Sequence, residues 1–131
     1  GSEPHTVGGA ITRAAAGIGE RIGATHLVTF TQSGDTARRL SRLRNHIPLL
    51  AFSPLQTTCN QLSVSWGVHA YKVDEVRHTD EMVKQVDQFL REKKLAPEGA
   101  QVVIVAGMPP GTPGATNSIR VHTVGEQVDF D

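Results

Sequence analysis

The sequence predicts an α/β fold, an open three-layer α/β/α sandwich around a mostly parallel five-stranded sheet whose last strand is an antiparallel edge. Short apolar segments alternate along the chain with segments of helical periodicity, which is typical of a doubly wound sheet. The segment Gln101–Ala106 is almost continuously apolar, as expected for a central strand covered on both faces. A length of 131 residues fits one domain, and we expect residues 3–131 to form it, with Gly1-Ser2 resembling a cloning scar.

The first half of the chain is expected to hold three helices and three strands. Residues 7–22 have apolar side chains at helical spacing, but four glycines cost such a helix about 1 kcal/mol each, so it should depend on tertiary contacts. Strands are expected at 26–31, 49–52 and 68–73. A second helix should run over 33–44 behind a Ser33 cap, and a third from Ser53-Pro54 to a point before Gly67.

The second half is expected to hold one helix and two strands. A helix opens at Thr79 and presents one apolar face, with basic residues complementing the dipole at its C-terminal end. After strand 101–106, three prolines and three glycines in residues 107–114 predict a loop. Residues 118–124 alternate as in a half-exposed edge strand. Ile119, Val121 and Thr123 would lie on one side, and Arg120, His122 and Val124 on the other.

The turn at 31–36 is a candidate phosphate site. It joins a strand to a helix, where the first backbone N–H groups lack internal partners and the helix dipole favours an anion. The hydroxyls of Thr31, Ser33 and Thr36 would add donors. Simple helix capping by Ser33 is the alternative. The basic stripe Arg38, Arg39, Arg42 and Arg44 would attract anions to this turn, or is only a solvated face.

Composition excludes several classes of function. Thirteen basic and thirteen acidic residues balance, so no nucleic-acid or membrane partner is indicated. The single cysteine, Cys59, is interpreted as a packed residue and fits a reducing cytoplasm. No apolar run reaches membrane-spanning length. The six histidines are scattered singly, so neither a metal site nor a catalytic cluster is predicted, and His69 and His122 are interpreted as surface or strand residues.

Two loops should meet at one edge of the sheet. In open α/β sheets, ligands bind beyond the carboxyl ends of the strands, near the point where strand order reverses. The turn 31–36 and the loop 107–114 both follow strands at that end. If their strands are neighbours, the two loops face each other across a crevice, and the second could act as a lid.

Several ordered blocks together resemble the C-terminal regulatory domain of bacterial pyruvate kinase, nearly from end to end. The blocks are Thr31-Gln32-Ser33-Gly34-Asp35-Thr36, Pro48-Leu49-Leu50-Ala51-Phe52-Ser53-Pro54, Trp66-Gly67-Val68, Thr79-Asp80-Glu81-Met82 and Gly107-Met108-Pro109-Pro110-Gly111-Thr112-Pro113-Gly114-Ala115-Thr116-Asn117.

The resemblance implies a regulatory role rather than catalysis. In that family a β/α barrel, to which these residues contain no counterpart, transfers phosphate from phosphoenolpyruvate to ADP with Mg²⁺ and K⁺. The C-terminal domain binds an allosteric effector, needs no cofactor and makes contacts in a homotetramer. The implied effector contacts are Thr31, Gln32, Ser33, Gly34, Asp35, Thr36, Gly111, Thr112, Pro113, Gly114 and Ala115, with Lys84 as a second anion contact. The implied subunit contacts are Ile119, Arg120, Val121 and His122.

Asp35 departs from relatives that bind fructose bisphosphate and have a basic residue there, which leaves a sugar monophosphate or AMP as the effector. Three other interpretations stay open. They are a freestanding phospho-ligand module, a purely structural oligomerisation domain, and a small hydrolase using Ser33 with His26 and Asp35, although Ser33 lacks the G-x-S-x-G elbow.

Overall fold

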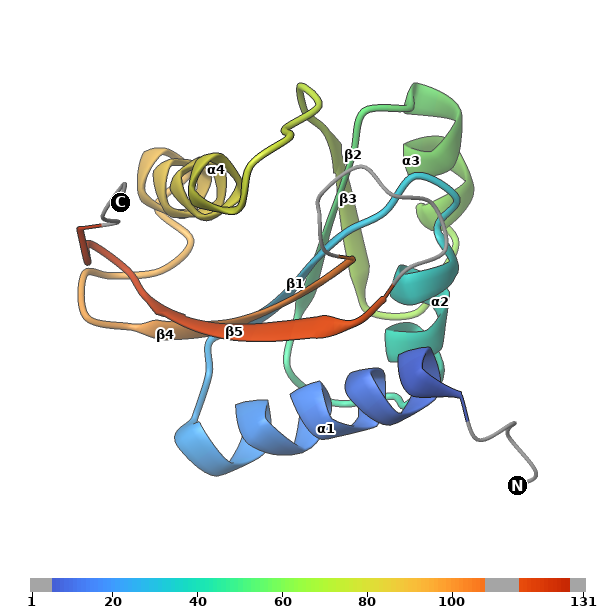
Figure 1. Ribbon diagram of the computed structural model, residues 1–131, viewed down its shortest axis with the longest axis horizontal. Coiled ribbons are helices and arrows are strands. Elements are labelled where there is room, and N and C mark those ends of the chain that lie inside the picture. Colours follow the sequence, from blue (N-terminus) through green and yellow to red (C-terminus); the bar gives the residue numbers. More distant parts are fainter. Residues whose placement is uncertain (1–5, 108–115, 128–131) are drawn as a thin grey trace.

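The described part of the chain forms four helices and five strands, and the five strands make one sheet. A computed structural model describes residues 6–107 and 116–127 (Figure 1). The elements are α1 (Val7–Ile22), β1 (His26–Phe30), α2 (Asp35–Arg42), β2 (Leu49–Ser53), α3 (Gln56–Leu62), β3 (Val68–Lys72), α4 (Thr79–Glu92), β4 (Gln101–Ala106) and β5 (Ser118–Thr123). None of the helices described has the length and apolar character needed to span a bilayer.

The strand order is β3-β2-β1-β4-β5. The first four strands are parallel, and β5 pairs antiparallel with β4 at the edge. Helices α1, α2 and α3 cover one face of the sheet and α4 covers the other (Figure 1). The predicted three-layer α/β/α sandwich with an antiparallel edge strand is confirmed.

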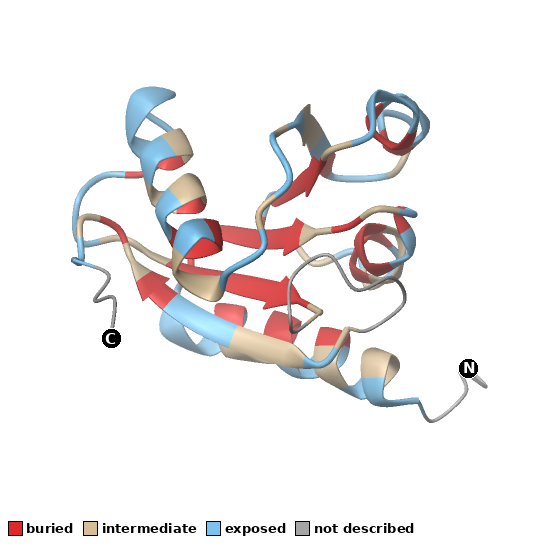
Figure 2. Cartoon of the chain, turned by 45° about the horizontal axis from the view of Figure 1, so that its top comes forward, coloured by how far each residue is buried: buried red, intermediate tan, exposed pale blue. Residues whose placement is uncertain are grey.

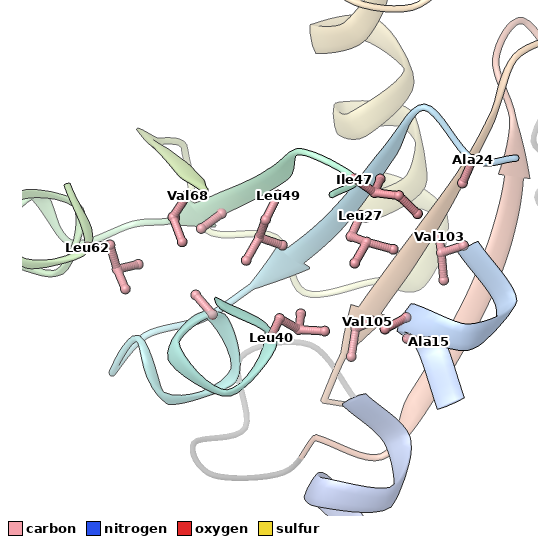
Figure 3. Close-up of a cluster of buried hydrophobic side chains, with 13 residues drawn as sticks. Ala15, Ala24, Leu27, Leu40, Ile47, Leu49, Leu62, Val68, Val103 and Val105 are labelled. Atoms are coloured by element: carbon pink, nitrogen blue, oxygen red, sulfur yellow. The ribbon is translucent and has the colours of Figure 1, made fainter. Parts of the chain in front are cut away.

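Two hydrophobic clusters fill the two sides of the sheet, because side chains alternate along each strand. In β4, Val103 and Val105 point to α1 and α2, whereas Val102 and Ile104 point to α4. Figure 3 shows the first cluster, in which Leu27, Leu49 and Val103 from three strands meet the helices. The inner strands are buried along most of their length, while β5 is intermediate or exposed over much of its own (Figure 2).

Helix α1 depends on tertiary contact, as its glycines predicted. A Cβ atom at Gly19 would lie 3.0 Å from side-chain carbons of Leu27 and Ile47. That distance is tighter than ordinary van der Waals contact, so glycine lets the helix pack closely onto the sheet. Cys59 is packed as predicted, and burial raises the pKa of its thiol.

Two helix starts differ from prediction. The N-cap of α2 is Gly34, in the left-handed region at φ 93°, and not Ser33, whose Oγ instead accepts from the Asp35 amide at 3.2 Å. Helix α3 begins at Gln56 rather than at Ser53-Pro54, and it ends at Leu62. Ser53 is still part of β2, where it pairs with Lys72, so the strand continues through the position expected to cap the helix.

The edge strand alternates, but its apolar residue Val121 faces outward. Val121 is 42% exposed, whereas His122 is only 1% exposed and Val124 is buried with it. The side of β5 that carries these two residues faces α4. There the Nε2 atom of His122 forms a hydrogen bond with Asp87 of that helix. His122 is therefore a strand residue, as predicted, but not a surface one.

Candidate functional site

The strand order reverses between β1 and β4, and a cavity of about 580 Å³ opens beyond the carboxyl ends of the strands there. Helix α2 follows β1 on one face of the sheet and α4 packs on the other. The described residues that line the cavity are Thr6, Gly8, Phe30, Thr31, Gln32, Ser33, Asp35, Thr36, Arg39, Phe52, Pro54, Leu55, Val73, Asp74, Glu75, Val76, Met82, Ala106, Gly107 and Thr116.

The turn 31–36 forms one wall of this cavity, at the start of α2. Several polar groups of the turn form hydrogen bonds within the turn or with α3. Thr31 Oγ1 accepts from the Gly34 amide at 2.8 Å, and Thr58 Oγ1 donates to the Gln32 carbonyl at 2.5 Å. Ser33 is exposed, and its hydroxyl lies at the cavity wall. The turn is thus held rigidly from within, while the helix start and Ser33 remain directed at the cavity.

A second helix start and an arginine complete this wall. Thr6 caps α1 by accepting from the Gly9 amide at 3.0 Å, and its hydroxyl also accepts from Arg39 Nη1 at 3.5 Å. A side chain at Gly8 would collide with the Arg39 guanidinium, so the start of α1 fits closely around that arginine. Two helix dipoles and one guanidinium therefore give this part of the cavity a positive potential.

Several lining residues were missed as individual site residues by sequence reasoning, among them Arg39, Thr6 and Thr116, and also Asp74 and Glu75 after β3. Arg39 was predicted only as one member of a basic stripe. Thr6 and Thr116 were not predicted, although Thr116 Oγ1 lies 2.5 Å from Thr36 Oγ1 and joins the start of β5 to α2. No local pattern indicates these contacts, because they connect segments 33 and 80 residues apart.

Asp35, the departure from the expected pattern, has a cation beside it. Its carboxylate lies 3.4 Å from Arg38 Nη1, which also donates to the Ser33 carbonyl at 3.1 Å. Both side chains are solvent-accessible, so the ion pair itself adds little stability. A carboxylate in the first turn of α2 is favoured by the helix dipole.

The opposite wall of the cavity is apolar and acidic. Phe30, Phe52 and Met82 come from the cluster beneath α4. Asp74 and Glu75 follow β3 and are both exposed. No Lys or Arg of residues 6–107 or 116–127 forms an ion pair with either acid. The cavity is therefore polarised, with its positive part at α1 and α2 and its negative part after β3.

Several predicted site residues lie elsewhere. Lys84 lines a separate hollow with Asp87 and Gly125, away from the turn 31–36. Gly111, Thr112, Pro113, Gly114 and Ala115 fall outside the described residues. His26 stands at the amino end of β1, whereas Ser33 follows its carboxyl end, roughly 15–20 Å away along the strand. The proposed hydrolase arrangement of Ser33 with His26 is therefore wrong.

The four predicted subunit contacts on β5 differ in exposure. Arg120 and Val121 are exposed, Ile119 packs partly on the core beside α1, and His122 is buried. Of the four, only Arg120 and Val121 are exposed. The His122 side chain is turned inward, so a subunit contact at this position would have to use its backbone.

His122 is buried in the sheet and contacts an acid of α4. Its Nε2 donates to Asp87 Oδ1 at 2.8 Å, and the Gly125 amide donates to the same oxygen at 2.8 Å. Burial alone would raise the pKa of Asp87, but these two hydrogen bonds and the nearby Arg91 together lower it. The other ring nitrogen, Nδ1, is buried and has no hydrogen-bond partner within residues 6–107 and 116–127.

No group of three or more metal-ligating side chains occurs within residues 6–107 and 116–127. The polarised cavity is thus the strongest candidate site in the described part of the chain. What it offers is binding of a small anion by backbone amides, hydroxyls and one guanidinium.

Comparisons with known proteins place this chain in one family. The family model described as pyruvate kinase, alpha/beta domain, matches residues 9–122. A pyruvate kinase of Mycobacterium tuberculosis is 50% identical over 123 residues, which cover 94% of this chain and 26% of that protein. A pyruvate kinase of Corynebacterium glutamicum is 42% identical over the same share of each chain.

Solved structures agree on the fold. A Cryptosporidium parvum pyruvate kinase superposes with a TM-score of 0.84 at 21% identity, covering 94% of this chain and 24% of that one. The chain spans about a quarter of the length of the curated relatives, with a covered share of 26%. With a family model matched over residues 9–122, the chain belongs to the pyruvate kinase alpha/beta domain family.

Proposed function

We propose that this chain is the effector-binding and subunit-contact domain of a pyruvate kinase. The parent enzyme would transfer phosphate from phosphoenolpyruvate to ADP in the cytoplasm, using Mg²⁺ and K⁺ at an active site outside these residues. The chain itself would bind a phosphorylated sugar or AMP and carry out no chemistry. The family match and the absence of a metal-ligating cluster from residues 6–107 and 116–127 support this division of labour.

One observation carries the proposal: two helix N-termini and Arg39 converge on a cavity of about 580 Å³ at the topological switch point. A phosphate there would accept hydrogen bonds from the first amides of α2, from the Ser33 hydroxyl and from the Arg39 guanidinium. A freestanding phosphate-binding module would have the same site, and the family membership favours a pyruvate kinase domain over such a module. A purely structural domain would have no need of a polarised cavity.

Effector binding would act by shifting a population. A ligand that links the turn 31–36 to the opposite side of the cavity binds best to the arrangement in which both are in place. Through the Thr36–Thr116 hydrogen bond, that arrangement is tied to the start of β5, the expected subunit edge. Coupling between such sites is typically about 1–3 kcal/mol.

Calorimetric titration of the purified chain tests the proposal. The ligands are AMP, glucose 6-phosphate, ribose 5-phosphate and fructose 1,6-bisphosphate. We expect saturable binding of at least one, weakened about tenfold or more in Arg39→Ala and several-fold in Ser33→Ala, because charge-assisted hydrogen bonds to phosphate are lost. Arg42→Ala, an exposed arginine of the same helix that does not line the cavity, is the matched control.

Three results would contradict the proposal or the position that it gives to the binding site. Absence of saturable binding for all four ligands would favour a structural role. Formation of pyruvate by the chain alone, from phosphoenolpyruvate and ADP, would contradict a purely regulatory domain. Equal loss of affinity in Arg39→Ala and Arg42→Ala would place the binding site away from the cavity.

A further inference from the structure

The charges around the cavity constrain the ligand more closely than the fold does. Within the described lining there are three carboxylates, Asp35, Asp74 and Glu75, against the single guanidinium of Arg39. Residues 108–115 read Met-Pro-Pro-Gly-Thr-Pro-Gly-Ala, so they contain no charged side chain. The described lining therefore supplies enough side-chain positive charge for one phosphate.

The negative charge is concentrated opposite the phosphate wall. Asp74 and Glu75 stand between Val73 and Val76, which pack on the cluster beneath α4, whereas the turn 31–36 leads into α2 on the other face. Strand β2 separates β1 from β3, so the ends of those two strands are two strand spacings apart, roughly 10 Å. The two walls are therefore far enough apart to meet opposite ends of one small molecule.

The connection that carries the two acids is fixed in place. Gln85 of α4 donates through Nε2 to the Asp74 carbonyl at 3.2 Å, and the Val73 amide donates to the Ser53 carbonyl at 3.0 Å. These bonds hold the backbone at Val73 and Asp74, where the segment leaves β3. Asp74 and Glu75 therefore lie on an anchored part of the cavity wall and not on a free loop.

We propose that the cavity selects a ligand with one phosphate and an uncharged, hydroxyl-bearing opposite end, and that Asp74 and Glu75 are the residues that reject a bisphosphate. This inference rests on the proposed function of the cavity. Carboxylates accept hydrogen bonds from hydroxyl groups and bring no donor to a phosphate. A second phosphate, with a charge of about −1.5 to −2, would lie beside two like charges.

Two matched pairs of ligands isolate the second phosphate. They are glucose 6-phosphate with glucose 1,6-bisphosphate, and ribose 5-phosphate with ribose 1,5-bisphosphate. In calorimetric titrations we expect the monophosphate of a binding pair to bind at least tenfold more tightly than its bisphosphate. In the double variant Asp74→Asn with Glu75→Gln, this ratio should fall to about one or reverse, with the monophosphate weakened only slightly.

Glu81→Gln is the control, because Glu81 is an exposed acid in the first turn of α4 that does not line the cavity. It should keep the wild-type ratio. The variants are isosteric and exposed, and unchanged circular dichroism and thermal midpoints would establish that they fold.

The outcomes separate this inference from the function on which it rests. If a bisphosphate binds as tightly as its monophosphate, or if the double variant keeps the wild-type ratio, the specificity inference is overturned while effector binding stands. If none of the four sugar phosphates binds, the specificity inference and the proposed binding of a sugar phosphate are both overturned. If Glu81→Gln changes the ratio as much as the double variant, the effect is one of overall charge and the assignment to Asp74 and Glu75 is wrong.

Discussion

At the scale of single residues, the contact between Asp87 and His122 shows how one buried acid fastens the edge of the sheet. One carboxylate oxygen accepts from His122 on β5 and from the Gly125 amide after it, each at 2.8 Å. The Asp87 side chain is only 14% exposed, so water cannot readily replace these partners. Hydrogen bonds to a charged group contribute about 1.5–3 kcal/mol in such settings.

Asp87→Asn should lower the free energy of unfolding at pH 7 by about 1–3 kcal/mol, because it removes the charge that both donors meet. The pKa of Asp87 is lowered on folding from its ordinary value of 3.8, so its stabilisation is present above that pH. It is lost as the pH falls further through the folded-state pKa. Urea unfolding between pH 7 and pH 3 measures the difference between variant and wild type.

The difference between the two proteins should stay constant from pH 7 to about pH 5 and shrink below pH 4. Asp80→Asn, in the first turn of the same helix, is a useful comparison because it makes the same chemical change outside the contact with His122 and Gly125. A pH-independent difference between Asp87→Asn and wild type would show that the loss comes from packing and not from charge.

This contact also shows where sequence reasoning stops. His122 was correctly expected to be a strand residue, but its burial depends on Asp87, which lies 35 positions earlier on a helix. The alternation of β5 placed Val121 and His122 on opposite sides of the strand, but it did not indicate which side is buried. The fold buries the side of His122, which donates a hydrogen bond to Asp87 of α4. The alternation of residues within β5 therefore could not indicate that His122 is buried against α4.

At the scale of helices and strands, the start of α2 depends on a glycine. Gly34 adopts φ 93°, and a Cβ atom there would lie 3.0 Å from the Arg38 guanidinium. Gly34→Ala should therefore destabilise the protein by about 1–2 kcal/mol, since an L-residue is strained in this conformation. It should also weaken ligand binding in the cavity, because the amides of the helix start would move.

The matched control for Gly34→Ala is Gly17→Ala. Gly17 lies within α1 and an added Cβ would meet nothing within 4 Å, so this change should stabilise by about 0.5–1 kcal/mol. Thermal and urea unfolding of both variants give the comparison. Opposite signs are expected, and two changes of the same sign would remove backbone strain at Gly34 as the explanation.

The elements themselves were largely predictable, and their ends were not. Apolar periodicity located every helix and strand of the described residues, because burial of one face is recorded in the sequence. The helix starts at Gly34 and Gln56 were misplaced, since each depends on geometry beyond the cap motif. The N-cap of α2 is Gly34, in a left-handed conformation, and not Ser33. Ser53 still pairs within the sheet, so α3 begins later in the sequence than predicted.

At the scale of the whole molecule, topology predicted where a cavity would lie. Because β1 and β4 are neighbours, Thr31 and Gly107, which directly follow them, line the same cavity at the switch point. Its charge pattern was not predictable, because Arg39, Asp74 and Glu75 come from segments whose relation only the fold determines. The two opposite walls arise from the two faces of the sheet.

The outer edge of β5 gives the last prediction. Within the described residues β5 pairs only with β4, so its other backbone edge has no strand beside it. An unpaired edge favours addition of another strand, and Val121, 42% exposed, lies in it. If the proposed subunit contact uses this edge, two copies would align their β5 strands and bring the two Val121 side chains close to the interface.

Val121→Lys should then raise the dissociation constant of the self-associated chain about tenfold or more, because it places like charges near each other in the paired edge. Light scattering after size-exclusion chromatography, over a range of concentrations, measures the mass of each variant. Val64→Lys is the matched control, since Val64 is 89% exposed in the turn between α3 and β3 and lies outside both edge strands. If Val121→Lys and Val64→Lys associate equally, or if the wild-type chain stays monomeric at every concentration, then the chain alone does not associate through β5. The subunit contact proposed for this edge would have to be abandoned for the isolated domain.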